Sequence, residues 1–314
     1  MFSTLFDKVT GLFDKRFVLG LLLPALAFAA GVACLAVTMT GWTRALAWWQ
    51  HLDGTRQVSL GVAAAAAIVL AATITGSQVN AMTRALEGYW RWEWADKVLG
   101  GPGRRFEGWR KRRLAQDASD AGYLRSSRAF GSGEVKRIMP TRLGNVLRTA
   151  ESYPGDKERW ELDAVFWWPR LYLVLPDSAR SQVDDARAAL DQLIVLAWLS
   201  GAFAVVALAL TGAGLALPVG LGCAGGGLLL SRAAYQAAVT SAAAFGELLR
   251  ACFDLYRGDV LKQLGWAMPP TLAEERELWA ALGQQLYRRG VSTARDALLK
   301  APRQPPPAAP AAGP

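Results

Sequence analysis

The sequence predicts an all-α integral membrane protein with four transmembrane helices, two of which extend into a cytoplasmic helical stalk or domain. Apolar residues make up 52% of the 314 positions and concentrate in three uncharged runs, at 17–43, 57–83 and 192–231. A helix needs about 20 apolar residues to cross a hydrocarbon core of roughly 30 Å. The first two runs are therefore one span each, and the third, with 40 residues, is long enough for two. The distribution of basic residues is the other observation that supports this class.

The elements follow in chain order. We expect the spans near 17–39, 58–76, 190–211 and 215–234. Glycine and proline in TGAGLALP, at 211–218, place the turn between the last two spans. The first apolar stretch continues to Met39 and follows sixteen residues, so it is too long and too late for a cleaved signal peptide.

The orientation follows from lysine and arginine. With four spans, 33 of the 35 basic residues fall on one side of the membrane, and only Arg44 and Arg56 fall on the other. The positive-inside rule assigns the basic side to the cytoplasm. Both termini are then expected in the cytoplasm, with the protein in the plasma membrane.

The stretch LDAVFWWPRLYLVLP, at 162–176, tests this topology because a fifth span would invert everything after it. Fifteen helical residues cover only about 22 Å, and Pro169 interrupts the hydrogen-bond ladder. Asp163 and Arg170 would each cost roughly 2.5–3.5 kcal/mol near the bilayer centre. We therefore expect this stretch not to cross the membrane.

The predicted segments combine these spans with helical regions on either side. They are an amphipathic interfacial helix at 1–16, transmembrane helices 1 and 2 at 17–76, a cytoplasmic helical domain at 77–189, transmembrane helices 3 and 4 at 190–234, a cytoplasmic helical region at 235–300 and a disordered proline-rich tail at 301–314. The first of these could equally pack on the cytoplasmic part of the protein.

Several helices are expected within the cytoplasmic segments. An apolar stripe from Val79 predicts that the second span continues as a helix to about Val98, where GGPG ends it. The seam from Tyr235 to Val260 extends the fourth span in the same way. Further helices are expected from Thr141 to about Glu151, from Asp177 or Ser178 into the third span, and after a capping box of Thr271 and Glu274 to about Arg289.

Catalytic, metal-binding and cofactor-binding patterns are mostly absent from the sequence. The single histidine, His51, falls in the predicted external loop, so a cytoplasmic histidine relay or zinc triad is not expected. GSGEVKR, at 131–137, is only a weak phosphate-loop pattern and favours a flexible loop. The carboxylates within 156–163 could bind a cation, but neighbouring basic residues favour a solvated turn. We expect no enzyme and no cofactor.

The stretch GRRFEGWRKRR, at 103–113, predicts a site for anionic lipid or another anion. Its basic residues are Arg104, Arg105, Arg110, Lys111, Arg112 and Arg113. Basic side chains near a membrane surface gain roughly 1 kcal/mol each from anionic lipid, and Phe106 and Trp109 could enter the headgroup layer. A nucleic-acid partner needs the same charges and stays open.

A structural or partner-binding core is predicted from PTRLGNVLRTAESYP and the tryptophan-rich stretch after it. Its residues are Arg142, Asn145, Arg148, Asp163, Trp167, Trp168 and Arg170. The first three recur at three-residue steps on one helix face. The aromatic residues would suit either a docked core or an interfacial belt. We favour the docked core because Tyr172, Leu173 and Leu175 need apolar partners.

TRLGNVLR, DAVFWWPRLYLVLP and ELLRACFDLYRGDVLKQLGWAMPP, together within 140–270, resemble the core of a family of uncharacterised bacterial multi-pass membrane proteins. The resemblance implies an integral membrane protein from a bacterium, and it implies no activity. Together with the orientation, it predicts a multi-pass protein of the bacterial inner membrane. At Glu161 this chain departs from the family pattern, which has glycine there.

Small residues four apart predict close helix packing, within the chain or between copies. The pairs are Ala63 with Ala67 and Gly222 with Gly226. The leading functional hypothesis is a non-enzymatic membrane anchor, assembly or interaction platform that forms a homo-oligomer or binds a protein partner. The alternative is an oligomeric ion channel or pore-forming effector. An enzyme that uses carboxylates, serine or arginine within 104–190 is a third and weaker hypothesis.

Overall fold

The structure is a computed structural model that describes residues 15–90, 96–116, 129–130, 138–288, 301 and 303. Its described residues are helical apart from turns, short links and one isolated bridge. The chain divides into two compact units. Unit 1 comprises 1–107, 139–144 and 185–242, and unit 2 comprises 108–138, 145–184 and 243–314. The predicted interfacial helix, apart from Lys15 and Arg16, lies outside the described residues, and so does most of the proline-rich tail.

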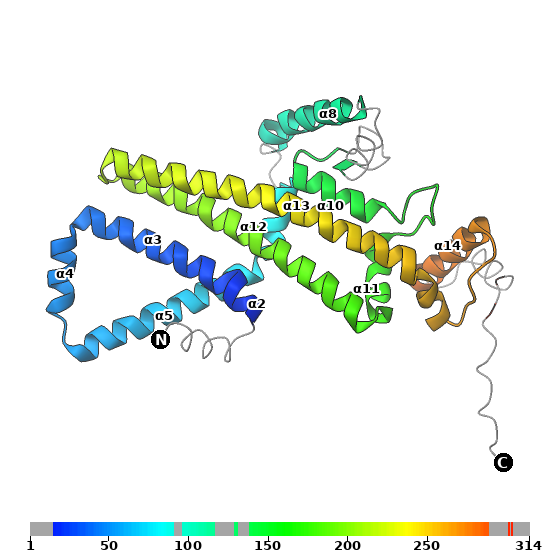
Figure 1. The fold of residues 1–314 in the computed structure, drawn as a ribbon, viewed down its shortest axis with the longest axis horizontal. Helices are drawn as coiled ribbons and strands as arrows, with labels where there is room; N and C mark the ends of the chain where they lie inside the picture. The colour runs from blue at the N-terminus through cyan, green and yellow to red at the C-terminus, as the bar shows by residue number, and fades with distance from the viewer. Residues whose placement is uncertain are drawn as a thin grey trace, which may run out of the picture. The chain divides into compact units, whose positions relative to one another are not determined.

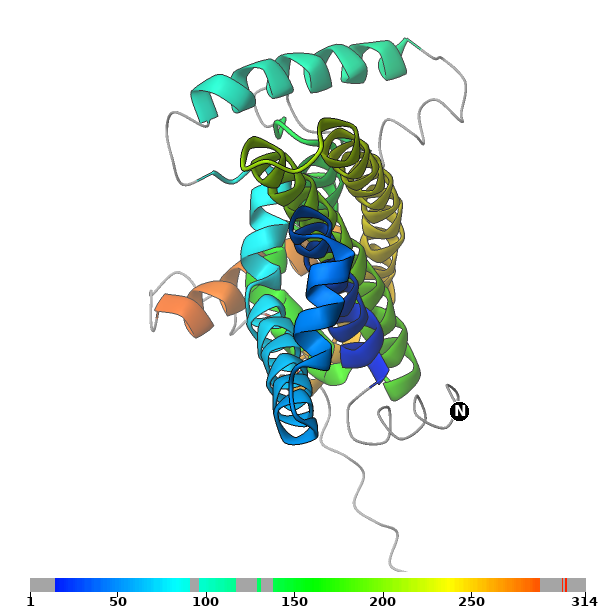
Figure 2. The same cartoon turned by 90° about the vertical axis from the view of Figure 1, so that its left-hand side faces the viewer.

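Four of the described helices are long and apolar enough to cross a membrane, as the sequence predicts. The first stretch comprises the π-helical η1 (Val18–Leu22) and α3 (Leu23–Thr40), and the short α2 (Lys15–Phe17) precedes it. The others are α5 (Gly54–Ser77), α12 (Asp177–Gly212) and α13 (Leu217–Gln263). The apolar parts of these helices lie side by side in unit 1 (Figures 1 and 2). The all-α class and the number of membrane-length helices are thus confirmed.

Local sequence signals set the ends of these helices. Gly41, with φ of +91°, ends α3, and a short amphipathic helix α4 (Trp42–Gln50) then leads toward α5. The Asp53 carboxylate accepts a hydrogen bond from the Arg56 amide at 3.3 Å and caps α5. Gly214, with φ of +115°, lies in the turn between α12 and α13, inside the range predicted for it.

Small residues bring α3, α12 and α13 close together. A Cβ atom added at Gly31 would lie 2.8 Å from the Phe203 ring, and one at Gly227 would lie 2.9 Å from the Ser200 carbonyl oxygen. The core between these helices consists of Leu35, Ala204, Ala207, Leu215 and Ala224. Alanine and glycine therefore set the distance between helix backbones within unit 1.

The second span does not continue to Val98, so that prediction is wrong. Instead α5 is followed by α6 (Val79–Glu87), which ends at Gly88 in the left-handed region with φ of +95°. The apolar stripe persists through this segment, but a glycine at the C′ position stops the helix ladder. GGPG also does not end a helix, because η2 (Asp96–Gly100) leads directly into α8 (Gly101–Ala115). Pro102 lies at the second position of α8, directly after the change from π-helix to α-helix.

In unit 1, the end of α6 makes a close contact with the start of α10 (Arg142–Ser152). The Thr141 hydroxyl donates to the Glu87 carbonyl oxygen at 2.8 Å and accepts from the Gly144 amide at 3.1 Å. A Cβ atom at Gly144 would lie 2.2 Å from the same carbonyl oxygen. Leu143 is fully buried, and its amide donates to the Tyr235 hydroxyl at 3.3 Å. In the TRLG sequence, the threonine therefore caps α10 and the glycine leaves room for the α6 backbone.

Unit 2 holds the rest of α10, α11 (Ala164–Val174) and α14 (Leu272–Arg288), together with the polar ends of α12 and α13. The predicted helix starts near Thr141, Asp177 and Thr271 are confirmed. The Thr271 hydroxyl accepts from the Glu274 amide at 3.3 Å, which is the expected cap of α14. α13 extends to Gln263, so the predicted continuation of the fourth apolar stretch is also confirmed.

Candidate interaction site

The loop before α11 fixes where this helix begins. The Asp163 carboxylate accepts from the amides of Val165 at 3.0 Å and Phe166 at 3.3 Å, which makes it the N-cap. Two residues earlier, Glu161 has φ of +54° and is the one described non-glycine residue with positive φ. The Leu162 amide then donates to the Pro154 carbonyl oxygen at 2.9 Å and closes the loop. The turn is therefore present although glutamate occupies a position that suits glycine.

One face of α11 is buried against other elements of unit 2. Trp167 is buried and meets Trp279 of α14 edge-on, with ring centroids 4.7 Å apart. Trp168 lies 6.1 Å from the ring of Phe253 on α13, and Leu171 is fully buried. Tilted and edge-on pairs of this kind contribute about 0.5–1.5 kcal/mol each beyond the area that they bury.

A buried carboxylate on α14 helps to position the residues that pack against the buried face of α11. Glu275 is only 4% exposed, and its Oε1 accepts from Arg257 Nε at 2.9 Å and from Trp279 Nε1 at 3.1 Å. The Arg257 guanidinium in turn lies 4.2 Å from the ring centroid of Trp160. A buried charge is tolerated only when it is paired and hydrogen-bonded, as Glu275 is here.

Tyr153 links the loop to α13. Its hydroxyl donates to the Asp254 carboxylate, whose oxygens lie 3.0 and 3.1 Å away. The guanidinium groups of Arg159 and Arg250 lie 3.9 and 5.3 Å from its ring centroid. Burial, and after it the hydrogen bond to Asp254, raise the pKa of the Tyr153 hydroxyl above its ordinary value.

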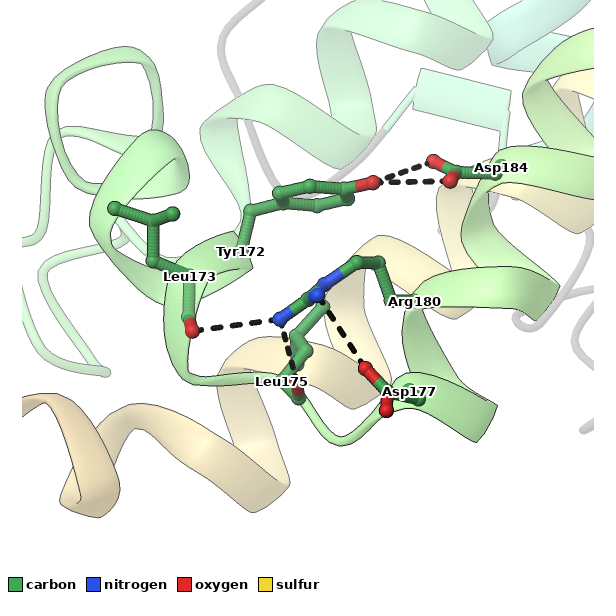
Figure 3. Close-up of polar contacts among 6 residues, drawn as sticks. All are labelled: Tyr172, Leu173, Leu175, Asp177, Arg180 and Asp184. Atoms are coloured by element: carbon green, nitrogen blue, oxygen red, sulfur yellow. Dashed lines mark hydrogen bonds and ion pairs between the residues drawn. The ribbon is translucent and has the colours of Figure 1, made fainter.

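Arg180 forms hydrogen bonds that link the end of α11 to the start of α12 (Figure 3). Its Nη2 donates to the carbonyl oxygens of Leu173 at 3.5 Å and Leu175 at 3.1 Å, while Nη1 donates to Asp177 at 3.4 Å. The Tyr172 hydroxyl donates to the Asp184 carboxylate, whose two oxygens lie 2.8 and 3.0 Å away. The two bonds from Arg180 Nη2 satisfy carbonyl groups at the end of α11, where the intrahelical ladder has ended.

The opposite face of α11 is exposed and apolar. Val165 is 73% exposed and Leu173 is 76% exposed, and Pro169 lies between them at four-residue steps. In Figure 3 the Leu173 side chain points away from the Tyr172 and Arg180 network. We call Val165, Pro169 and Leu173 the α11 ridge. It carries no charge, so α11 has one face suited to a core and one suited to a partner.

The structure separates the predicted core residues by environment. Asn145, Asp163 and Trp167 support unit 2 through burial or capping, and Arg170 Nη1 donates to the Phe166 carbonyl oxygen at 2.7 Å. Arg148 is half-buried on α10. Arg142 is exposed and its Nη1 donates to Gln236 at 3.2 Å in unit 1. These arginines therefore do not share one environment, because the helix face turns gradually over two three-residue steps.

The other predicted site residues lie elsewhere. Ala63, Ala67, Gly222 and Gly226 are exposed, so the single chain does not use them for its own packing. The basic residues of 104–113 lie on α8. Among the described residues, no group of three or more histidine, cysteine, aspartate or glutamate side chains could hold a metal ion.

Sequence reasoning missed the residues that hold α11 from the other side. Glu275 and Trp279 are four residues apart on α14, a spacing that places them on one helix face. This spacing was a usable signal for their contact. Their partner Arg257 lies on another helix, and no pattern in the sequence indicates that pairing.

Comparisons with protein-family models, with curated proteins and with solved structures give no match to this chain.

Proposed function

We propose that the chain is a non-enzymatic multi-pass membrane protein that serves as an anchored interaction or assembly platform. The observation that supports this most is the α11 ridge, an exposed apolar surface whose reverse side is tied down by aromatic packing and by Arg180. A rigid apolar surface loses little conformational entropy when a partner covers it. We expect that partner to be a protein, either another copy of this chain or a different one.

The membrane location of this platform is part of the proposal. α12 and α13 each combine a polar part with an apolar part that is long enough to cross a membrane. The bias of 33 of 35 basic residues supports an orientation with both termini in the cytoplasm. The plasma membrane of a bacterium is proposed from the family resemblance alone.

Photo-cross-linking in living cells tests the platform. A photoreactive phenylalanine at Leu173 should give a discrete cross-linked band that depends on light, because this side chain is exposed on the ridge. The matched control places the same residue at Glu158, which is exposed outside the ridge and should give no such band. If neither Leu173 nor Val165 cross-links to any protein, the α11 ridge is not a partner surface and the proposal fails.

A pore-forming oligomer is the second candidate, and one observation favours it. Few residues in the apolar part of α5 are buried in the single chain, and its exposed residues include the closely spaced Ala63 and Ala67. Small residues on exposed membrane-length helices allow copies of a chain to approach closely. Ion currents from purified protein in bilayers that change in Ala67→Leu would favour the pore, whereas silent bilayers would count against it.

A further inference from the structure

The helix α8 turns one charged and aromatic face outward. At 100° per residue, one arc of about 120° collects three arginines, two aromatic residues, a proline and the helix-terminal glutamine. These residues are Pro102, Arg105, Phe106, Trp109, Arg112, Arg113 and Gln116, and all are exposed. We call this arc the α8 face. Phe106 is 59% exposed and Trp109 is 51% exposed, which is unusual for side chains of their size.

The remaining basic residues of the stretch are turned elsewhere or paired. Arg104 Nη1 lies 2.8 Å from an oxygen of Asp96. The Arg110 guanidinium lies 4.9 Å from the ring centroid of Phe130, and Lys111 is half-buried, which lowers its pKa. The one acidic residue of the helix, Glu107, is buried. The α8 face therefore contains positive charge and no carboxylate.

We propose that the α8 face lies on the membrane surface and binds anionic phospholipid headgroups, with Phe106 and Trp109 inserted among them. Arginine recognises phosphate by charge and by bidentate hydrogen bonds, and aromatic residues favour the interfacial layer. The Arg113 guanidinium lies 5.0 Å from the Trp109 ring centroid, which lets cation and ring enter that layer together.

The choice of lipid over nucleic acid rests on the membrane location in the proposed function. With four membrane-length helices, the proposed function places this chain in a lipid bilayer, so a lipid surface lies near the chain at all times. α8 begins fourteen residues after the end of α6, and this connection spans at most about 50 Å when extended. Phosphate in a duplex would attract the same arginines, so the experiment includes that outcome.

Lipid quenching of a fluorophore tests the proposal with the full chain in nanodiscs. The parent variant has Cys34, Cys223 and Cys252 replaced by serine, and it carries one fluorophore through Gln116→Cys on the α8 face. Acyl-brominated lipids should quench this fluorophore in discs that contain phosphatidylglycerol, and much less in phosphatidylcholine alone. High salt should reverse the quenching because it screens the arginines.

Matched variants separate the α8 face from the other basic residues. Combined Arg105→Gln, Arg112→Gln and Arg113→Gln should lower the ratio of inserted to free fluorophore at least about tenfold, since each arginine contributes to lipid binding. Arg104→Gln should leave the ratio unchanged because Arg104 lies off this face. A fluorophore at Gln284→Cys on α14 reports quenching that does not depend on α8.

Three results would overturn the proposal. The first is equal quenching at Gln116 in the two lipid compositions, and the second is quenching that survives the triple substitution. The third is tight binding of duplex DNA or RNA that the same substitutions abolish while lipid composition has no effect. None of these results bears on cross-linking at Leu173, so a failure of this inference is distinguishable from a failure of the platform.

Discussion

At the scale of single residues, polar and charged side chains in unit 2 determine where α11 begins and ends and how its neighbour on α14 is oriented. Asp163 caps the N-terminus of α11, and Arg180 donates to a carbonyl group just after its C-terminus. Glu275 accepts a hydrogen bond from Trp279, which packs against α11. Each forms a hydrogen bond to a backbone or side-chain group that no helix bond satisfies, and polar groups are costly to leave unpaired where they are buried.

Glu161 offers the first test at this scale. A non-glycine residue in the left-handed region costs about 1 kcal/mol or more, so Glu161→Gly should raise the free energy of unfolding by about 1 kcal/mol. Denaturant titration of the purified protein in detergent micelles, read by tryptophan fluorescence, would measure this. Glu158→Gly is the control, and it should not stabilise. A loss of stability in Glu161→Gly would show that the glutamate makes contacts that outweigh its backbone strain.

Glu275 should behave in the opposite way. Removing the carboxylate in Glu275→Ala leaves Arg257 without its ion-pair partner in a mostly buried site and should cost about 3 kcal/mol of unfolding free energy. Glu274→Ala removes the exposed neighbouring carboxylate and should cost no more than about 0.5 kcal/mol. The same denaturant titration compares them, and equal effects would show that the buried network contributes little.

Tyr153 predicts a dependence on pH. Its pKa is raised in the folded protein above the ordinary value of 10.0, so the folded state holds this proton more tightly than the unfolded state. The stabilisation is complete below pH 10 and is lost as the pH rises through the higher folded pKa. Unfolding titrations at pH 9 and at pH 11 should therefore differ more in the wild type than in Tyr153→Phe. An identical pH effect in both proteins would refute this role.

At the scale of elements, features set by local sequence were predictable, whereas features set by a single backbone conformation or by the tertiary fold were not. The four apolar stretches, the cap of α14 and the long α13 were predictable because hydropathy, capping and periodicity are local. The end of α6 at Gly88 was not, because an apolar stripe continues past it and a left-handed glycine leaves no change in hydropathy. The partners of α11 were also not predictable, since Arg257 and Glu275 meet only through the tertiary fold.

Gly144 tests the junction between α6 and α10. Glycine to alanine in a helix usually stabilises a protein by roughly 0.5–1 kcal/mol. At Gly144, however, the new Cβ would meet the Glu87 carbonyl oxygen, so Gly144→Ala should destabilise the protein in the same titration. Gly283→Ala on α14 is the matched control, because nothing lies within 4 Å of its added Cβ, and it should stabilise. Equal signs for the two variants would show that α6 does not pack this closely on α10.

At the scale of the whole molecule, the membrane topology decides which surfaces can meet a partner. α4 carries the exposed apolar residues Trp42, Leu46 and Trp49 at three- and four-residue steps, and in unit 1 it connects α3 to α5. In the proposed topology this helix lies at the external surface, where tryptophan is favoured at the interface. The α11 ridge and the α8 face then belong to the cytoplasmic side.

Labelling from either side of the membrane tests that arrangement. In a chain whose three native cysteines are replaced by serine, a cysteine at His51 should react with an impermeant maleimide in spheroplasts, because the loop after α4 faces outward. A cysteine at Gln284 should react only in inverted vesicles, since α14 follows the last apolar stretch. The reverse pattern would place the basic residues outside, against the positive-inside rule. It would remove both the anionic inner leaflet from the reach of α8 and cytoplasmic partners from the reach of the α11 ridge.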